Sequence, residues 1–327
     1  MPGGHTYIHV DVFSPRPYSG NSLAVFPDAA GLDGEQMAAI TKELRHFESI
    51  FLRPSTDDPR TFSARVFDLI EELDFAGHPL IGAACALHDS LHTAERERWT
   101  LRLKARTVTV ETERRNAGRY FAVLDQGPAE FLGTADSSRL AGIAAWFSLG
   151  ADDLDRSLPP EIVSTGLRYL VLPLRGDALA RARIAIPDLE RKLAEMDAQF
   201  AYLLNAEQLE ARHWNNDGVI EDVATGSGAG CAAAYLRSHG RIGDGESVAL
   251  KQGRFTGRPS EIVMRAHGSG RRVHPVEIGG DVSIVGNGEL YALPGARLPG
   301  KSVPERSRES GSDLSGSVAD GRVVPAR

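Results

Sequence analysis

Two glycine-rich turns, which begin at Gly77 and Gly226, are the parts of the sequence whose residue types most directly indicate chemistry. Each turn opens an apolar helix rich in alanine and glycine. The first turn of such a helix has backbone N–H groups without partners inside the helix, and the peptide dipoles favour negative charge there. Each turn can therefore hold a carboxylate or a similar anion. The glycines could also serve only to let a helix pack closely against a sheet, and neither turn alone decides between these roles.

Polar side chains beside both turns favour the binding role. His78 directly follows Gly77, and Glu221 and Asp222 lie just ahead of Gly226. A histidine at a helix start often only makes a structural hydrogen bond, and acidic residues before a helix often act only as caps. Two such turns facing each other would form a cleft suited to a small carboxylate.

The elements around the turns recur in both halves of the chain. Strand patterns, and a helix that Asp33 is placed to cap, precede the first turn. In the second half Asp188 is placed to cap a helix, and a strand and the Gly226 turn follow in the same order. The expected strands are residues 5–13, 21–26, 49–52, 62–69, 99–114, 119–124 and 200–204; the helices carry Met37, Ile40 and Leu44, then residues 80–87, then Leu189, Leu193 and Met196, then residues 231–236.

This repeated order predicts an α+β fold of two similar lobes, each a curved mixed sheet wrapped around a central helix. We expect the N-terminal lobe to contain residues 1–125 and 283–294, and the C-terminal lobe residues 126–282. Residues 295–327 are rich in Ser, Gly, Pro and charge and lack aromatic residues, which is typical of a disordered tail.

Composition argues against several classes of partner. The 327 residues include 44 acidic and 37 basic ones, a net charge of −7, so neither nucleic acid nor a membrane surface is an expected partner. The start of the chain lacks the basic and apolar segments of a secretion signal. Cys85 and Cys231 each lie in an apolar stretch, as buried cysteines of a reducing compartment do. We therefore expect a cytoplasmic location.

Several blocks of the sequence resemble the PhzF-like family of phenazine biosynthesis, and they span roughly Ile8 to Leu293 in the family's order. The blocks are Asp11-Val12-Phe13, Ser19-Gly20-Asn21-Ser22-Leu23-Ala24-Val25-Phe26, Glu43-Leu44 to Glu48-Ser49, Arg65-Val66-Phe67, Glu72-Leu73-Asp74-Phe75-Ala76-Gly77-His78-Pro79, Ser164-Thr165-Gly166-Leu167, Glu221-Asp222-Val223-Ala224-Thr225-Gly226-Ser227, Gln252-Gly253 and Gly257-Arg258-Pro259-Ser260.

The resemblance implies the diaminopimelate-epimerase-like fold, with the substrate bound between the lobes, and relatives that are commonly homodimers. It also implies the site, and it alone singles out Glu48, which its position would otherwise suggest to be an exposed acid after a helix. By this resemblance the catalytic glutamate is Glu48, the cleft histidine His78 and the substrate-contacting aspartate Asp222, while Gly77, Gly226 and Ser227 offer donors to the substrate carboxylate.

The implied reaction is an allylic isomerisation without metal, nucleotide or organic cofactor. Related epimerases of this fold use two cysteines, one before each glycine turn, where this chain has Ala76 and Thr225. Thiolates of Cys85 and Cys231, inside the helices, would be costly and remote from the cleft. A single carboxylate can take a proton from one carbon and deliver it to another on the same face, which moves a double bond.

The expected function is that of a trans-2,3-dihydro-3-hydroxyanthranilate isomerase, acting on a small cyclic or unsaturated amino acid-like carboxylate in secondary metabolism such as phenazine or antibiotic biosynthesis. Substrate identity stays open, because Val223 and Gly228 replace a proline and an alanine common in the family, and His46-Phe47 precede Glu48. Two alternatives stay open as well: an epimerase or dehydratase that uses Thr225 as a second group, and a non-catalytic binder of small molecules.

Two further patterns are weaker. Residues 295–302 match the phosphate-binding loop letter for letter, but prolines stand where the following helix must start, so a nucleotide-dependent enzyme is a remote third alternative. His88 and His92 lie four residues apart at an expected helix end, without the glutamate or third ligand of a zinc site. We expect them to lie at an exposed helix terminus.

Overall fold

One continuous mixed sheet organises the part of the chain that the computed structural model describes, residues 4–91 and 94–295. Its seventeen strands within those residues are β1 (His5–Val12), β2 (Asn21–Phe26), β3 (Glu48–Pro54), β4 (Thr61–Asp68), β5 (Glu72–Leu73), β6 (Arg96–Arg102), β7 (Thr107–Asn116), β8 (Arg119–Asp125), β9 (Glu130–Thr134), β10 (Glu161–Ser164), β11 (Arg168–Leu174), β12 (Phe200–Asn205), β13 (Glu210–Trp214), β14 (Glu221–Asp222), β15 (Val248–Gln252), β16 (Ser260–Ser269) and β17 (Arg272–Leu290). The helices are α1 (Gly34–Leu44), α2 (Gly77–Leu91), α3 (Leu140–Trp146), α4 (Ala178–Arg181), α5 (Leu189–Ala194) and α6 (Gly226–Ser238), with 3-10 turns η1 (Ser137–Arg139), η2 (Ala151–Asp153) and η3 (Arg254–Thr256).

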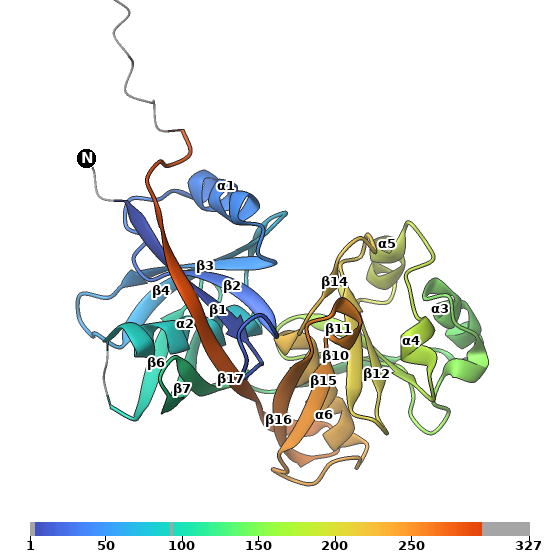
Figure 1. The fold of residues 1–327 in the computed structure, drawn as a ribbon. Helices are drawn as coiled ribbons and strands as arrows, with labels where there is room; N and C mark the ends of the chain where they lie inside the picture. The colour runs from blue at the N-terminus through green and yellow to red at the C-terminus, as the bar shows by residue number, and fades with distance from the viewer. Residues whose placement is uncertain (1–3, 92–93, 296–327) are drawn as a thin grey trace, which may run out of the picture. The chain divides into compact units, whose positions relative to one another are not determined.

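The first half of the sheet closes on itself around α2. Strands β1, β2, β3, β4, β6, β7, β8 and β17 pair in that order, and β17 pairs in turn with β1. Helix α2 contacts β1, β2, β3, β6, β7, β8 and β17, and Figure 1 shows it among these strands. Residues 77–88 of α2 are all buried, which explains why this helix is built of small and apolar residues without a polar face.

The second half repeats this arrangement around α6. From β2 to β8 the pairings run parallel, antiparallel, parallel, antiparallel, antiparallel. From β11 to β17, through β12, β13, β15 and β16, they run in the same succession. Helix α6 contacts β10, β11, β12, β16 and β17, and its residues 226–236 are all buried. The predicted α+β class, with two similar halves that each wrap a central helix, is confirmed.

A short hairpin leads into each central helix, and both hairpins carry the same ion pair. Strand β4 pairs with β5 ahead of α2, and β13 pairs with β14 ahead of α6. The Arg65 guanidinium makes two bonds of 2.7 and 2.6 Å to the Glu72 carboxylate. Arg212 makes the equivalent two bonds to Glu221, of 2.8 and 2.7 Å. The duplication therefore extends to the side chains that brace the segments before the glycine turns.

Strand β17 belongs to both halves (Figure 1). It pairs with β16 over residues 272–279 and with β1 over residues 282–290. The expected lobe boundary between 282 and 283 thus falls inside one strand, and the exact boundaries stay a prediction. Residues up to Pro294 form one compact unit. Beyond Gly295, the expected tail and the phosphate-loop pattern lie outside the described residues.

Two of the sequence expectations are wrong in detail. The strand expected at residues 99–114 is two strands, β6 and β7, because the chain turns where Leu103 N–H donates to the Arg106 carbonyl at 2.9 Å. The helix after Asp188 ends at Ala194 and excludes Met196, and the Asp188 side chain makes no capping bond because its carboxylate binds Arg191. By contrast, Asp33 and Gln36 form a full capping box at α1.

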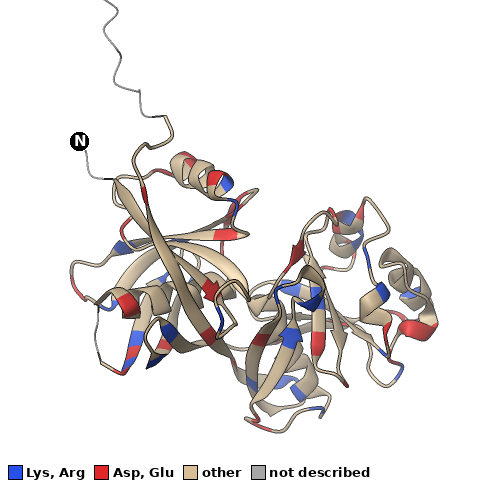
Figure 2. Ribbon diagram, viewed as in Figure 1, with Lys and Arg blue, Asp and Glu red and all other residues tan. Residues whose placement is uncertain are grey.

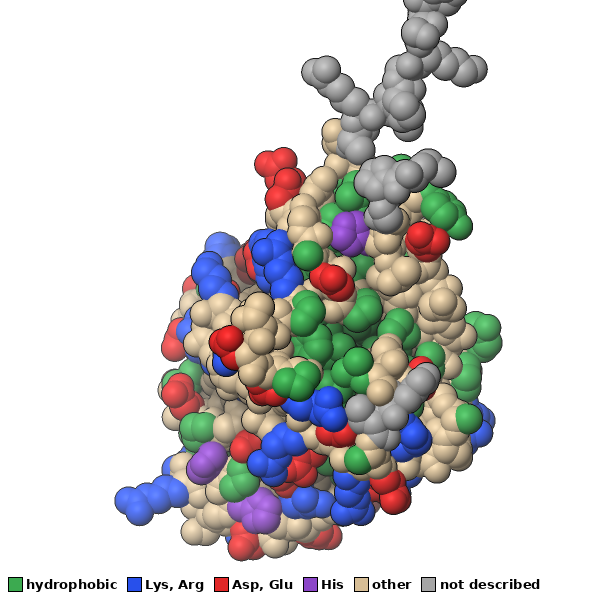
Figure 3. Space-filling model, turned by 90° about the vertical axis from the view of Figure 1, so that its left-hand side faces the viewer, with side chains coloured by type: hydrophobic (Ala, Val, Ile, Leu, Met, Phe, Trp, Pro, Cys, Tyr) green, Lys and Arg blue, Asp and Glu red, His purple; other side chains and the backbone are tan. Residues whose placement is uncertain are grey.

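Charge is distributed without an obvious sign preference over the described residues. Figure 2 shows basic and acidic segments mixed in both halves of the ribbon. On the face drawn in Figure 3, hydrophobic side chains gather near the middle, and basic and acidic side chains are mixed around and below them. No helix within residues 4–91 and 94–295 is long and apolar enough to cross a membrane.

The close wrapping of α2 predicts that Gly82→Ala destabilises the protein by about 1–3 kcal/mol, the usual effect of overpacking. A Cβ at Gly82 would lie 2.5 Å from Leu23 Cδ2 and 2.9 Å from Val12 Cγ2. Gly142 in α3 is the matched control, because no heavy atom lies within 4 Å of a Cβ there. Gly142→Ala should stabilise by about 0.5–1 kcal/mol through helix propensity. Urea unfolding measures both, and stabilisation by both variants would contradict the packing described.

Candidate active site

The glycine turns of the two halves meet backbone to backbone. A Cβ at Gly77 would lie 3.2 Å from the carbonyl carbon of Gly226, and a Cβ at Gly226 would lie 3.2 Å from the backbone nitrogen of His78. A side chain at either position would therefore crowd the backbone of the other turn, which favours glycine at both. Beside the contact lies a cavity of about 230 Å³, and all six residues predicted from the sequence line it: Glu48, Gly77, His78, Asp222, Gly226 and Ser227.

Glu48 is the first residue of β3 and points into this cavity rather than into bulk solvent. Its side chain is 9% exposed, and its Oε2 lies 3.4 Å from Nδ1 of His78. It stands opposite Asp68 on the neighbouring strand β4. Burial raises the pKa of Glu48 well above its ordinary value, and the charges of Asp222 and Asp68 raise it further. The raised pKa favours the protonated form of Glu48, which is the form that a general acid needs.

His78 is the second residue of α2 and is neutral at physiological pH. Burial lowers its pKa to about 4, against a smaller opposing effect of the Asp222 charge. Its Nε2 is buried and has no hydrogen-bond partner among the described residues. A buried polar atom without a partner is costly, so Nε2 is well suited to a ligand.

The Asp222 carboxylate is held on both sides. Oδ1 accepts a bond of 2.8 Å from Asn21, and Oδ2 accepts one of 2.7 Å from the Thr225 hydroxyl. Gln252 braces the same segment, because its amide donates to the Asp222 carbonyl and to Thr225 Oγ1, each at 2.9 Å. The Thr225 hydroxyl therefore uses its one proton in the hydrogen bond to Asp222.

The second turn is fixed by buried partners. The Ser227 hydroxyl lies 2.8 Å from the phenol oxygen of Tyr169. Gln126 donates to the Gly226 carbonyl at 3.0 Å. These bonds leave the first-turn N–H groups of α2 and α6 as the available donors for a carboxylate in the cavity.

Sequence reasoning missed the aromatic wall of the cavity. Tyr169, Phe200 and His213 line it, and their rings contact one another with centroids 5.4–5.5 Å apart. The His213 Nδ1 lies 2.9 Å from the Ala201 carbonyl and must donate to it, so Nε2 is the acceptor of this ring. These residues stand alone in unremarkable strand patterns, and only their place across from Glu48 reveals them.

The two halves place different side chains at equivalent positions of the cavity. The paired strands make Glu48 equivalent to Phe200, and Leu73 equivalent to Asp222. At the turns, Ala76 corresponds to Thr225 and His78 to Ser227, and all eight of these residues line the cavity with Gly77 and Gly226. At these equivalent cavity positions, only the first half carries a glutamate, Glu48.

The family follows from comparison with known proteins. Residues 10–288 match the model of the PhzC-PhzF family, described as phenazine biosynthesis-like protein. The chain belongs to this family.

The relatives and solved structures agree with this assignment. A trans-2,3-dihydro-3-hydroxyanthranilate isomerase from Pseudomonas aeruginosa is 34% identical over 294 residues, which cover 88% of this chain and 99% of the relative. One from Pseudomonas fluorescens is 33% identical, with the same coverage. A solved structure described as a predicted epimerase from Pseudomonas aeruginosa is 46% identical, with a TM-score of 0.82 over 88% of this chain and 99% of that one. A hydroxyproline epimerase from Agrobacterium vitis, at 14% identity and a TM-score of 0.58 over 88% and 93%, shares the fold alone.

The departures from the family pattern have local structural reasons. A Cβ at Gly228 would lie 2.6 Å from the Tyr202 ring, so the chain needs glycine where Tyr202 fills the space. His46 makes a bond of 2.6 Å to Ser22, and its ring lies tilted against that of His9 with centroids 4.6 Å apart, whereas its neighbour Phe47 lines the cavity. Of the two, only Phe47 can bear on substrate choice directly.

Other candidate sites of the sequence are not supported by the described residues. They contain no group of three or more His, Cys, Asp or Glu side chains placed to hold a metal ion. His88 is fully buried, with Nδ1 2.8 Å from Thr112 Oγ1 and Nε2 2.7 Å from the Ala94 carbonyl. The expectation of an exposed histidine at that helix end is therefore wrong; His92 lies outside the described residues.

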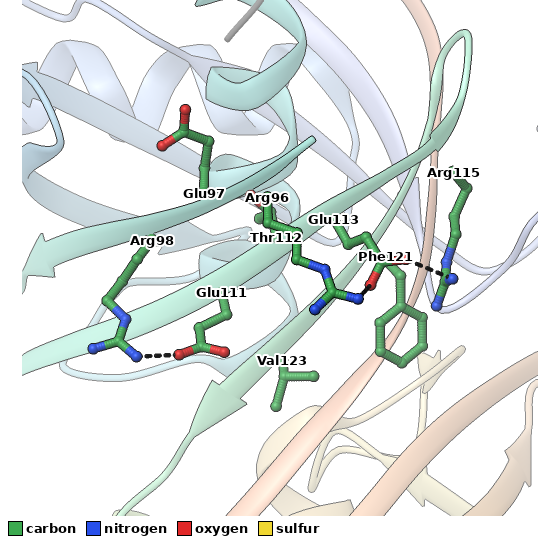
Figure 4. Close-up of a pocket in the computed structure, with 9 residues that line it drawn as sticks. All are labelled: Arg96, Glu97, Arg98, Glu111, Thr112, Glu113, Arg115, Phe121 and Val123. Atoms are coloured by element: carbon green, nitrogen blue, oxygen red, sulfur yellow. Dashed lines mark hydrogen bonds and ion pairs between the residues drawn. The ribbon is translucent and has the colours of Figure 1, made fainter. Parts of the chain in front are cut away.

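A larger hollow of about 450 Å³ lies on β6, β7 and β8, away from the glycine turns. Figure 4 shows that its charged side chains pair with one another across the strands, Arg98 with Glu111 and Arg96 with Glu113. Glu113 also binds Arg115 at 2.7 Å, and Glu97 binds Arg60 at 2.8 Å. These are solvated ion pairs of a strand surface, and none is a buried acid or base.

The burial of neutral His78 predicts a specific acid sensitivity. Its pKa is about 4 in the folded protein, below the ordinary value of 6.5, so the unfolded chain takes up the proton first as the pH falls. Relative to His78→Gln, the wild type should lose up to about 3 kcal/mol of unfolding free energy between pH 7 and pH 4. Urea unfolding of both proteins at the two pH values measures this, and parallel pH dependence would contradict a buried neutral imidazole.

Proposed function

We propose that this protein is a cofactor-independent isomerase of the trans-2,3-dihydro-3-hydroxyanthranilate isomerase type. It moves a proton, and with it a double bond, within a small cyclic or unsaturated amino acid-like carboxylate. The observation that carries the proposal is the buried Glu48 carboxyl, placed 3.4 Å from neutral His78 in a cavity between two helix N-termini.

Glu48 acts as both base and acid in this proposal. It takes a proton from one carbon and returns it to another carbon on the same face of the substrate. The raised pKa suits this double role, because it stabilises the protonated form of Glu48 that must hold the proton and return it. With only 9% of its side chain exposed, Glu48 exchanges its captured proton slowly with bulk water.

The cavity favours a substrate with both a carboxylate and an amine. The helix N-termini that begin at Gly77 and Gly226 supply N–H donors for the carboxylate. Six carboxyl side chains but no lysine or arginine are among the described residues that line the cavity; the six are Glu48, Asp68, Glu71, Glu72, Asp74 and Asp222. A cationic amine is therefore attracted and a second anionic group is repelled. Asp222 and the Nε2 atom of His78 orient the amine or hydroxyl.

An epimerase is the second candidate, because the 46% identical solved structure is described as a predicted epimerase. Epimerisation needs a second group on the opposite face of the carbon, and Thr225 stands where the related enzymes have a cysteine. The donation of the Thr225 hydroxyl to Asp222 at 2.7 Å weighs against that role. Solvent deuterium in recovered substrate, with inversion, would identify an epimerase.

The wider setting is part of the same proposal. We place the enzyme in the cytoplasm, in a secondary metabolic pathway such as phenazine biosynthesis. Its partners are then a small-molecule substrate and a second copy of the chain in a homodimer, and neither nucleic acid nor a membrane surface.

The central prediction is that Glu48→Gln lowers kcat on trans-2,3-dihydro-3-hydroxyanthranilate by at least about 100-fold, since a general acid–base contributes roughly 10²–10⁴-fold. The measurement is proton NMR of the substrate incubated with enzyme. Glu35→Gln is the matched control, because Glu35 is an exposed carboxylate on α1 and is not among the residues that line the cavity.

Two results would count against the proposal. Equal turnover by wild type and Glu48→Gln would remove the glutamate from the chemistry. Ligand binding that persists in Glu48→Gln, with no turnover by the wild type, would identify a small-molecule binder instead.

A further inference from the structure

Asn21 connects the two halves of the protein at the cavity, and the reaction described so far does not use it. It is the first residue of β2 and is 1% exposed. Its amide nitrogen lies 2.8 Å from Asp222 Oδ1 and 2.9 Å from the Ala224 carbonyl oxygen. A side chain of the first half therefore holds the segment of the second half that precedes the Gly226 turn.

The orientation of the Asn21 amide is dictated by these neighbours. An amide oxygen at the same place would face a carboxylate oxygen and a carbonyl oxygen, neither of which can donate. The nitrogen must therefore point to both, and its two hydrogens are used by Asp222 and Ala224.

Because Asp222 and Ala224 use both amide hydrogens of Asn21, His78 receives no hydrogen bond from it. Its Nδ1 is the third neighbour of the Asn21 nitrogen, at 3.4 Å, but no hydrogen of Asn21 is left for it. The remaining neighbour of Nδ1 is Glu48 Oε2, also at 3.4 Å. Asn21 therefore leaves Nδ1 facing Glu48 Oε2, which has no hydrogen-bond partner among the described residues.

We propose that Asn21 is a positioning residue for the isomerase reaction: it fixes the Asp222 carboxylate at the cavity wall and leaves His78 Nδ1 to face Glu48. Together with the Thr225 hydroxyl, it holds both carboxylate oxygens of Asp222 and so sets the plane of that group. The expected change in kcat rests on the proposed function. The expected placement of Asp222 and His78 by Asn21 does not.

Three variants test the proposal. Asn21→Ala removes both hydrogen bonds that the amide donates. We expect kcat to fall about 100-fold, the usual effect of displacing groups at an active site. Asn205→Ala is the matched control. Asn205 is also 1% exposed, but it binds the Gly176 carbonyl and the Gln208 backbone N–H instead of cavity residues. It should lower the melting temperature comparably and leave kcat unchanged.

Asn21→Asp tests whether the hydrogen bond that Asn21 donates to Asp222 matters for the reaction, or whether Asn21 only supports the fold. The introduced carboxyl would face Asp222 and His78 and, beyond His78, Glu48, and it can donate only while protonated. Its kcat relative to wild type should therefore rise as the pH is lowered from about 8 to about 5. The same ratio for Asn21→Ala should stay flat, because division by the wild type removes the titration of the native groups. Wild-type kcat in Asn21→Ala, or a flat ratio in Asn21→Asp, overturns the proposal.

A measurement made without substrate tests this inference independently of the proposed function. If the wild type does not convert trans-2,3-dihydro-3-hydroxyanthranilate, the proposed function fails, and the ¹⁵N shifts of the His78 ring then decide the positioning claim. In histidine-labelled protein at pH 7 these shifts should change in Asn21→Ala and stay in place in Asn205→Ala. Unchanged His78 shifts in Asn21→Ala overturn the inference.

Discussion

The rest of the structure depends on the contact between the first turns of α2 and α6. Gly77 and Gly226 come so close that a Cβ on either would lie 3.2 Å from the backbone of the other turn. This contact places the unpaired N–H groups of two helices beside one cavity, where their dipoles add to attract a carboxylate. Each helix is also wrapped by its own half of the continuous sheet, which is why both are built almost entirely of small and apolar residues. The binding site and the core are thus consequences of one packing arrangement.

The two halves share one scaffold, but their side chains differ at the cavity, so the two sides of the site are not equivalent. Both halves keep the sequence of strand pairings and the Arg–Glu pair before the glycine turn. At the cavity, however, the position of Glu48 in one half is taken by Phe200 in the other, and the position of Asp222 by Leu73. A pair of symmetric acids would favour proton exchange on two faces of a carbon. One buried carboxyl facing an aromatic wall favours transfer along a single face.

How much the sequence could predict differs between parts of the molecule. The glycine turns, the repeated order and the apolar central helices follow from local patterns, and the structure places all six predicted site residues around one cavity. Glu48 came only from family resemblance, because nothing local marks a strand-initial glutamate as buried. The roles of Tyr169, His213 and Asn21 depend on strand pairing and on contacts between residues far apart in the chain, which no local pattern contains. The split between β6 and β7 was missed because threonine and valine continue the strand composition on both sides of the turn at residues 103–106.

The central claim is that one carboxyl carries the same proton between two carbons. The most direct test uses trans-2,3-dihydro-3-hydroxyanthranilate labelled with deuterium at the carbon that loses its proton, converted by the wild-type enzyme in ordinary water. The account predicts that part of the label appears at the accepting carbon of the product, because a buried Glu48 exchanges slowly with solvent. Product formed at full rate with only solvent hydrogen at that carbon would contradict the account.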